Sequence, residues 1–254
     1  MKRILLTAII MLWSIVPVVA AEQEQELGVT FDIQYHSKWL SKGVEAYGQQ
    51  GAFFEIIDLD LYGSGFGLQV IHRHATGSGY VNKQRFDYRP YCTGKLFEEE
   101  PYAMNYNIGV EYEHYPRLAT HRSFTSFEWI FAFSWPNILP KGLVPGYIAH
   151  YEYPVHHDYR FNYTGWVHRF KLDYNLDVPQ LPKPLRLSSE VAYTDGLGGA
   201  SHDWSYATFG LGTKFDITEN LTFTPAVYQQ ITMDKSVSRR KDITYCMLSM
   251  KYKF

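Results

Sequence analysis

The sequence predicts an all-β fold, an antiparallel up-and-down transmembrane β-barrel of about 12 strands. Apolar and polar residues alternate along nearly the whole chain after residue 21, and a period of two is the signature of a strand with two different faces. The predicted strands run to roughly 10 to 14 residues, and about 9 to 11 are enough to cross a bilayer at a tilt. Aromatic residues make up 17% of the chain, with 21 tyrosines, beside 20% charged residues.

The first element is an apolar run that we expect to be removed. Lys2 and Arg3 precede the apolar stretch 4–19, which closes on two alanines, and this is the pattern of a secretory signal peptide. No later segment reaches the roughly 20 consecutive apolar residues that a membrane-spanning helix requires. The predicted division is therefore 1–21 signal peptide and 22–254 barrel domain.

The mature chain carries little net charge. Without Lys2 and Arg3, 22 basic residues stand against 26 acidic ones, a formal charge of about −4. This balance predicts no nucleic-acid partner, and no cofactor is expected. Cys92 and Cys246 fall on predicted strands that are not neighbours, so free thiols are expected.

The alternation of apolar and polar residues predicts the position of each strand. In 102–115 the apolar face carries Ile108 and Val110, and the opposite face carries Glu111 and Glu113. A shift of one residue would move both glutamates to the apolar side, so the register is well defined. The predicted strands are 28–39, 49–61, 65–75, 84–97, 102–115, 123–135, 143–153, 163–175, 185–194, 203–217, 220–230 and 242–254.

The connections alternate between short turns and longer polar loops. With the N-terminus in the periplasm, the turns after even-numbered strands are periplasmic, and these include the tight turn 62–65. The opposite connections, such as 41–50 and 232–242, are mostly longer, and that asymmetry is typical of outer-membrane barrels.

The last strand is expected to close the barrel. Leu248 and Met250 share its apolar face with the terminal Phe254, while Ser249 and Lys251 lie on the other face. An open sheet edge in lipid would leave backbone groups unpaired at several kcal/mol each, so this strand should pair with the first one. Its pattern looks like the signal that the barrel assembly machinery reads, and we predict Phe254 as the outer-membrane sorting signal.

Charged residues of both signs lie opposite the apolar stripes. Tyrosine and tryptophan favour the strand ends on the apolar face, as in the aromatic girdles of membrane barrels. The charged faces would then line a polar lumen. The predicted lumen-lining residues are Glu55, Arg73, Arg85, Asp87, Arg89, Lys95, Glu111, Glu113, Glu128, Glu152, Arg169, Lys171, Arg186, Glu190 and Lys214.

Several functions fit these charges. A barrel of 8 strands has a lumen just filled by side chains and one of 16 has a wide channel, so about 12 strands predict a narrow pore or a plugged one. In the plugged alternative the charges only form salt bridges across a closed structural barrel. In a third alternative, a soluble periplasmic β-sandwich, they face water.

An outer-membrane lipid-modifying hydrolase is a further alternative. It would need a histidine and a serine within hydrogen-bond reach, and no such pair is two residues apart on one strand face. His36 and Ser37 are adjacent and would point to opposite faces. His72 and His74 share the apolar face near the outer rim, where we expect them among lipid headgroups. We predict no catalytic residue and no metal site.

The loops add two minor hypotheses. His156 and His157 stand beside Asp158, but adjacent loop histidines are expected to be solvated rather than metal ligands. The basic run 239–241 is a candidate for binding the phosphates of lipopolysaccharide.

The segment 31–75 resembles the opening strands of the TorF-like family of small porins. In that family a serine, a basic residue, an aromatic and a glycine end the first strand, and a glycine- and phenylalanine-rich hairpin follows. The family's usual basic residue directly before that glycine is Lys42 here, which is a mild departure from the family pattern. The resemblance implies a porin-type barrel and transfers no catalytic residue. The matching residues are Ser37, Lys38, Trp39, Lys42 and Gly43, then Gly63, Gly65, Phe66 and Gly67.

The strand count is also similar to that of Tsx-type nucleoside channels and acidic-sugar channels, without a motif match to either. The sequence thus predicts a porin-like channel of the bacterial outer membrane for passive diffusion of small polar or charged solutes. Its expected partners are outer-membrane lipids, lipopolysaccharide and, during biogenesis, the barrel assembly machinery.

Overall fold

The computed structural model describes residues 26–118, 124–155, 164–181, 183–200, 202–234 and 242–254. The predicted signal peptide 1–21, the loop histidines at 156 and 157 and the basic run 239–241 lie outside these ranges. None of the helices in the described part of the chain has the length and apolar character needed to cross a membrane.

Twelve long strands of 9 to 12 residues form one antiparallel sheet. Each of the 12 predicted ranges overlaps one of them. They are β1 (Gly28–His36), β4 (Ala52–Asp60), β5 (Phe66–Ala75), β6 (Arg85–Leu96), β7 (Met104–His114), β8 (Ser126–Ser134), β9 (Leu143–Pro154), β10 (Gly165–Leu176), β11 (Leu185–Asp195), β12 (Asp203–Gly212), β14 (Leu221–Thr232) and β15 (Ile243–Lys253).

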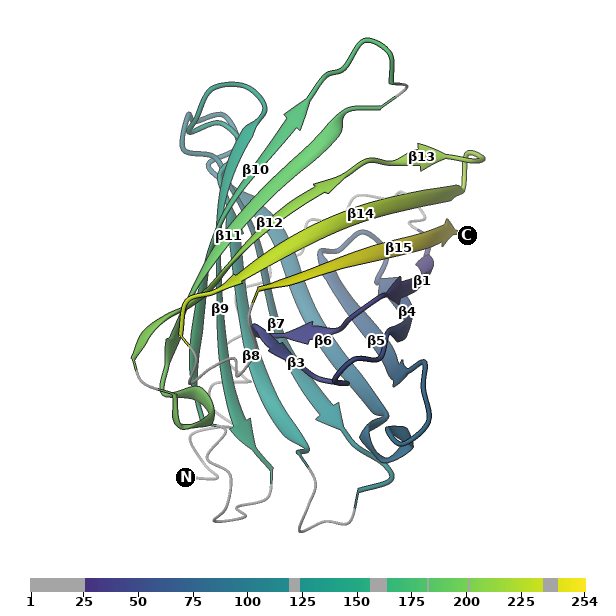
Figure 1. The fold of residues 1–254 in the computed structure, drawn as a ribbon. Coiled ribbons are helices and arrows are strands. Elements are labelled where there is room, and N and C mark those ends of the chain that lie inside the picture. Colours follow the sequence, from purple (N-terminus) through teal and green to yellow (C-terminus); the bar gives the residue numbers. More distant parts are fainter. Residues whose placement is uncertain (1–25, 119–123, 156–163, 182, 201, 235–241) are drawn as a thin grey trace, which may run out of the picture.

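The sheet closes into a barrel (Figure 1). Sequential strands are neighbours, β12 pairs with β14, and β1 pairs with β15, so that Ile33 lies opposite Met250. The backbone N–H of Phe254 donates to the carbonyl of Val29 at 3.0 Å, which continues this pairing to the last residue. The expected closure of the last strand on the first is confirmed.

The two faces of the sheet are the reverse of those in a soluble protein. Large apolar side chains such as Phe209 (51% exposed) and Met250 (49%) lie on the outer face, whereas Asp87 (0%), Glu113 (2%) and Glu128 (3%) are buried on the inner face. A sandwich would bury the apolar face instead. This distribution fits a barrel with a hydrocarbon environment outside and a polar lumen inside.

The remaining elements are short. β2 (Leu40–Ser41) and β3 (Val44–Glu45) form a hairpin in the connection between β1 and β4, and β13 (Phe215–Asp216) pairs with β14 beyond the end of β12. The predicted strand 203–217 is thus interrupted at residues 213 and 214. Single 3₁₀ turns occur at Val81–Lys83 and Leu197–Gly199.

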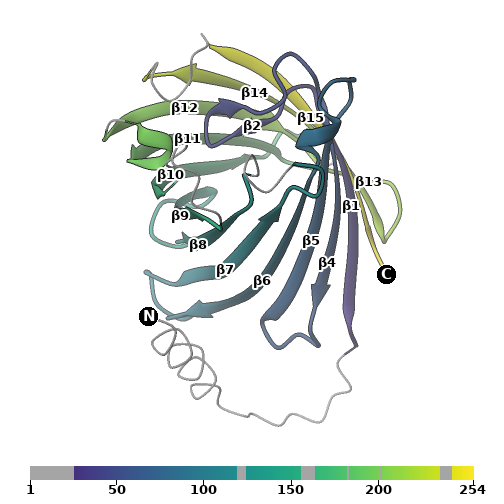
Figure 2. The same ribbon diagram turned by 90° about the horizontal axis from the view of Figure 1, so that it is seen from below.

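The β2–β3 hairpin folds into the barrel instead of extending outward (Figure 2). Its two-residue turn is Lys42-Gly43, with φ of 49° and 83°, and positive φ at both central positions is the requirement of a type I′ turn. Trp39 and Tyr47 at its base are buried against Phe54 and Ile71. We call the barrel end that contains this hairpin the loop end, and the opposite end the turn end.

The predicted first strand, 28–39, ends earlier, at His36. The Ser37 hydroxyl accepts a hydrogen bond from the backbone N–H of Cys246 at 2.9 Å, and the chain then turns toward the lumen. Cys92 on β6 and Cys246 on β15 are free thiols on strands that do not pair, as expected.

Candidate functional site in the barrel lumen

Most of the predicted lumen residues lie on the inner face. At the loop end, Arg73 and Arg85 contact Asp87, and Arg85 also contacts the two glutamates of β7. Lys42 links this group to the glutamates of β8 and β9. Arg89 donates to Gln69 at 2.6 Å on the same inner face. Lys95 lies at the rim of the turn end, with its side chain 64% exposed beside Glu98.

Glu55 lies on the outer face, so its assignment to the lumen is corrected. It is directly opposite Ile33 on β1 and His72 on β5. Residues directly opposite each other on neighbouring strands share a face, and Ile33 is 42% exposed on the outer side. The inner face of β4 is apolar here because Phe54 packs against Trp39 of the hairpin base.

A row of three carboxylates holds the tip of the hairpin. The ammonium of Lys42 lies 2.6 Å from Glu152 Oε2, 3.0 Å from Glu128 Oε2 and 3.9 Å from Glu113 Oε1. Burial by itself lowers the pKa of Lys42, but the three carboxylates outweigh it and hold that pKa well above its ordinary value. The lysine therefore stays charged throughout the pH range in which the protein would work.

Two arginines hold the base of the hairpin. The guanidinium groups of Arg73 and Arg85 lie over the ring of Trp39, 5.5 and 5.1 Å from its centroid. Arg85 also contacts Asp87 at 2.7 Å and Glu113 at 2.6 Å. Because Glu113 contacts both Arg85 and Lys42, base and tip belong to one ionic network.

The turn of the hairpin fits closely against the opposite wall. The side chain of Gln230, 1% exposed, donates to the Gly43 carbonyl at 2.9 Å. A Cβ atom at Gly43 would lie 2.3 Å from the ring of Tyr206. The hairpin thus spans the loop end of the lumen, from the carboxylates of β7 to β9 to the side chains of β12 and β14.

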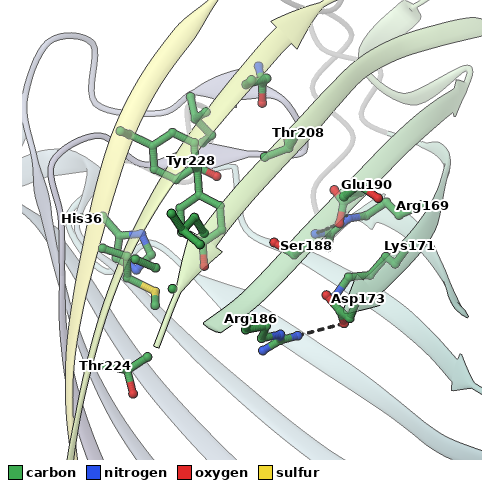
Figure 3. Close-up of a pocket in the computed structure, with 18 of the residues that line it drawn as sticks. His36, Arg169, Lys171, Asp173, Arg186, Ser188, Glu190, Thr208, Thr224 and Tyr228 are labelled. Carbon is green, nitrogen blue, oxygen red and sulfur yellow. Dashed lines mark hydrogen bonds and ion pairs between the residues drawn. The ribbon is translucent and has the colours of Figure 1, made fainter. Parts of the chain in front are cut away.

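A cavity of about 810 Å³ lies beside the hairpin and extends toward the turn end. In Figure 3, Arg169, Lys171, Asp173 and Arg186 line one side of it, and Tyr228 lies on the other. Tyr228 is stacked on Tyr245, with centroids 5.0 Å apart.

Basic side chains outnumber acidic ones around this cavity. Asp173 and Glu190 are the acidic lining residues among those described, and each is paired with an arginine. Arg186 contacts Asp173 at 2.9 Å, and Arg169 donates to both carboxylate oxygens of Glu190, at 2.8 and 2.7 Å. In the described part of the chain, Lys171 and Lys214 form no ion pair. The basic lining residues are Lys42, Arg169, Lys171, Lys183, Arg186 and Lys214.

Sequence reasoning did not single out Lys42, Gln230 or Tyr206 as lumen residues. Lys42 lies in a loop, and nothing in the alternation shows that the loop turns inward. Its one local signal is the Lys42-Gly43 pair, which suits a tight turn but does not indicate what the turn contacts.

Comparison with known proteins shows the fold. No protein family model and no curated protein matches this sequence. Among solved structures, a KdgM porin has a TM-score of 0.54 and 12% identity, over 89% of this chain and 99% of its own. A KdgM porin in complex with disordered oligogalacturonate has a TM-score of 0.53 and 11% identity, over 89% and 99%.

An outer membrane channel from Pseudomonas putida F1 has a TM-score of 0.50 and 10% identity, over 93% of this chain and 100% of its own. Identities this low show the fold alone. The chain therefore has the barrel fold of porins and outer-membrane channels.

Proposed function

We propose that the protein is an outer-membrane channel for small solutes and that its lumen favours anions. The observation that carries this proposal is the cavity in the closed barrel, where the neighbouring carboxylates Glu190 and Asp216 pair with Arg169 and Lys183, and Lys171 and Lys214 form no ion pair within the described residues. Fixed charges that line a pore select ions of the opposite sign. The apolar outer face supports insertion into the membrane, because its side chains would then contact lipid instead of water.

The similar structures support the solute class without identifying it. One of them is a KdgM porin solved with disordered oligogalacturonate, which is an acidic sugar chain. Carboxylates pair well with arginine and lysine, and the cavity offers both. Galacturonate is therefore a suitable test anion beside chloride.

Ion selectivity in planar bilayers tests the proposal. Under a potassium chloride gradient, the reversal potential of the channel should have the sign of anion selectivity. The double variant K171E/K214E should move it toward cation selectivity, since four charge units change in the lumen wall. K95E is the matched control for the single variants K171E and K214E: it makes the same two-unit change at the exposed rim and should shift the potential much less than either. A wild-type pore that prefers cations would refute the proposal.

The hairpin favours a second candidate, a barrel that is closed at rest. Lys42, Gly43 and Trp39 fill the loop end with paired charges and packed rings. If wild-type protein inserts into bilayers and shows no conductance, this closed barrel is the better description. The TorF-like resemblance, the binding of lipopolysaccharide and recognition by the barrel assembly machinery remain predictions.

A further inference from the structure

A glutamate and two histidines meet on the outer face of the barrel, away from the lumen. Glu55 on β4 lies directly opposite His72, and His74 follows two residues later on the same face of β5. The Nδ1 atoms of His72 and His74 lie 2.8 and 3.6 Å from Glu55 Oε2. All three ligand atoms lie within 4.8 Å of one another.

We propose that Glu55, His72 and His74 bind a divalent transition-metal ion, with zinc as the reference ion. Two imidazole nitrogens and one carboxylate oxygen form an established zinc ligand set, which leaves a fourth position open. Ligands that lie ~2.0 to 2.2 Å from a tetrahedral zinc ion are roughly 3.3 to 3.6 Å apart. The distances from Glu55 Oε2 to His72 Nδ1 and His74 Nδ1, 2.8 and 3.6 Å, lie below this ligand spacing and at its upper limit, respectively.

The hydrogen-bond pattern is a second observation that points to a cation. Glu55 Oε2 has the His72 ring at 2.8 Å and no other partner among the described residues, and His74 Nδ1 has no hydrogen-bond partner there, although both atoms are sealed from solvent. Polar atoms in that position are costly unless something satisfies them. One cation between the three side chains would satisfy both atoms at once.

Neighbouring groups hold the two rings in place. The side-chain amide of Gln84 contacts Nε2 of His72, and the ring of His72 stacks on Phe86 with centroids 4.4 Å apart. Metal-binding histidines usually engage their second nitrogen in this way, which fixes the ring orientation. His74 packs beside Phe53, with centroids 5.7 Å apart.

The cluster lies near the loop end of β5, close to where the chain enters the 76–84 connection. The side chains are partly exposed, at 25% for His72, 33% for Glu55 and 36% for His74. Because the cluster lies on the outer face, a metal ion can reach it without entering the lumen. The site depends only on the pairing of β4 with β5, and it is independent of whether the lumen conducts.

Metal content and affinity test the site. The full chain, folded in detergent and stripped with a chelator, is incubated with Zn²⁺, dialysed and analysed for zinc by mass spectrometry. We expect one ion per chain. Competition with a chromophoric chelator should show that E55Q, H72A and H74A each weaken binding at least about 10-fold, by analogy with losses around known metal sites.

H168A is the matched control, because His168 is also on the outer face but contacts Tyr147 instead of a carboxylate. It should keep wild-type affinity. The heat-dependent shift on SDS gels confirms that each variant is a folded barrel, and H74Q replaces H74A if the alanine variant does not fold. Failure of the wild type to retain zinc, or undiminished binding in E55Q or in H72A/H74A, would overturn the proposal.

Discussion

At the scale of single residues, the turn of the inner hairpin is the most constrained position in the lumen. Lys42 adopts φ of 49°, a conformation that disfavours any side chain with a Cβ atom. Glycine at position 43 avoids that cost, and it also avoids the ring of Tyr206. The contacts of Lys42 with buried carboxylates offset the strain at the first of the two positions.

Gly43→Ala should destabilise the hairpin through both effects. Left-handed backbone costs an alanine about 1 to 2 kcal/mol, and displacing the Tyr206 ring adds to this. Gly79→Ala is the matched control, because Gly79 has φ of 89° with nothing near its missing Cβ. Urea unfolding in detergent, followed by tryptophan fluorescence, should give a larger loss for Gly43→Ala. Equal losses would mean that the contact with Tyr206 contributes nothing.

At the scale of elements, the hairpin and the strands β7 to β9 stabilise each other. Glu113, Glu128 and Glu152 are each at most 8% exposed, and like charges buried this close together repel strongly. Lys42 supplies the opposite charge, with hydrogen bonds to two of the three. The Ser126 hydroxyl lies between two of these carboxylates, 2.9 Å from Glu152 and 3.2 Å from Glu113, and its single proton can be donated to either.

Lys42→Met should release the hairpin tip. Removing one partner from a buried ionic group costs about 3 to 5 kcal/mol, and the three carboxylates would repel one another without it. We expect a larger single-channel conductance in planar bilayers, because the hairpin no longer spans the loop end. Lys38→Met, in the same connection, is the control and should conduct like the wild type. An unchanged conductance for Lys42→Met would show that the hairpin is held by its base alone.

At the scale of the whole molecule, closure of the sheet is what makes the fold compatible with lipid. Every long strand has two neighbours, including the first and last, so none of the long strands described here is an open edge. Heating should open this barrel and change its migration. We expect unboiled samples to run at a different apparent mass from boiled ones on SDS gels. Recovery of the mature protein from periplasmic extract without detergent would contradict membrane insertion.

The sequence predicted the barrel well because alternation is a local property. Strand 102–115 and the apolar face of the last strand could be read directly, and the structure has both. Glu55 was misplaced because β4 is apolar on its two faces: Phe53 points outward, while Phe54 packs on the hairpin. Alternation cannot assign a face where both faces are apolar.

The role of Lys42 depends on contacts far along the chain. Its partners Glu128 and Glu152 are 86 and 110 residues away. Nothing near Lys42 in the sequence encodes those contacts, so only the folded chain brings them together. Glu55 and His72 differ in this respect, because they lie on consecutive strands and meet through the pairing of β4 with β5.

The unequal distribution of charge along the barrel axis has an electrical consequence. At the loop end, the carboxylates of Asp87, Glu111, Glu113, Glu128 and Glu152 outnumber the cations of Lys42, Arg73 and Arg85. Toward the turn end, lysine and arginine prevail. We expect a pore that is negative at one mouth and positive at the other to act as a diode and to conduct unequally under the two polarities of the applied voltage.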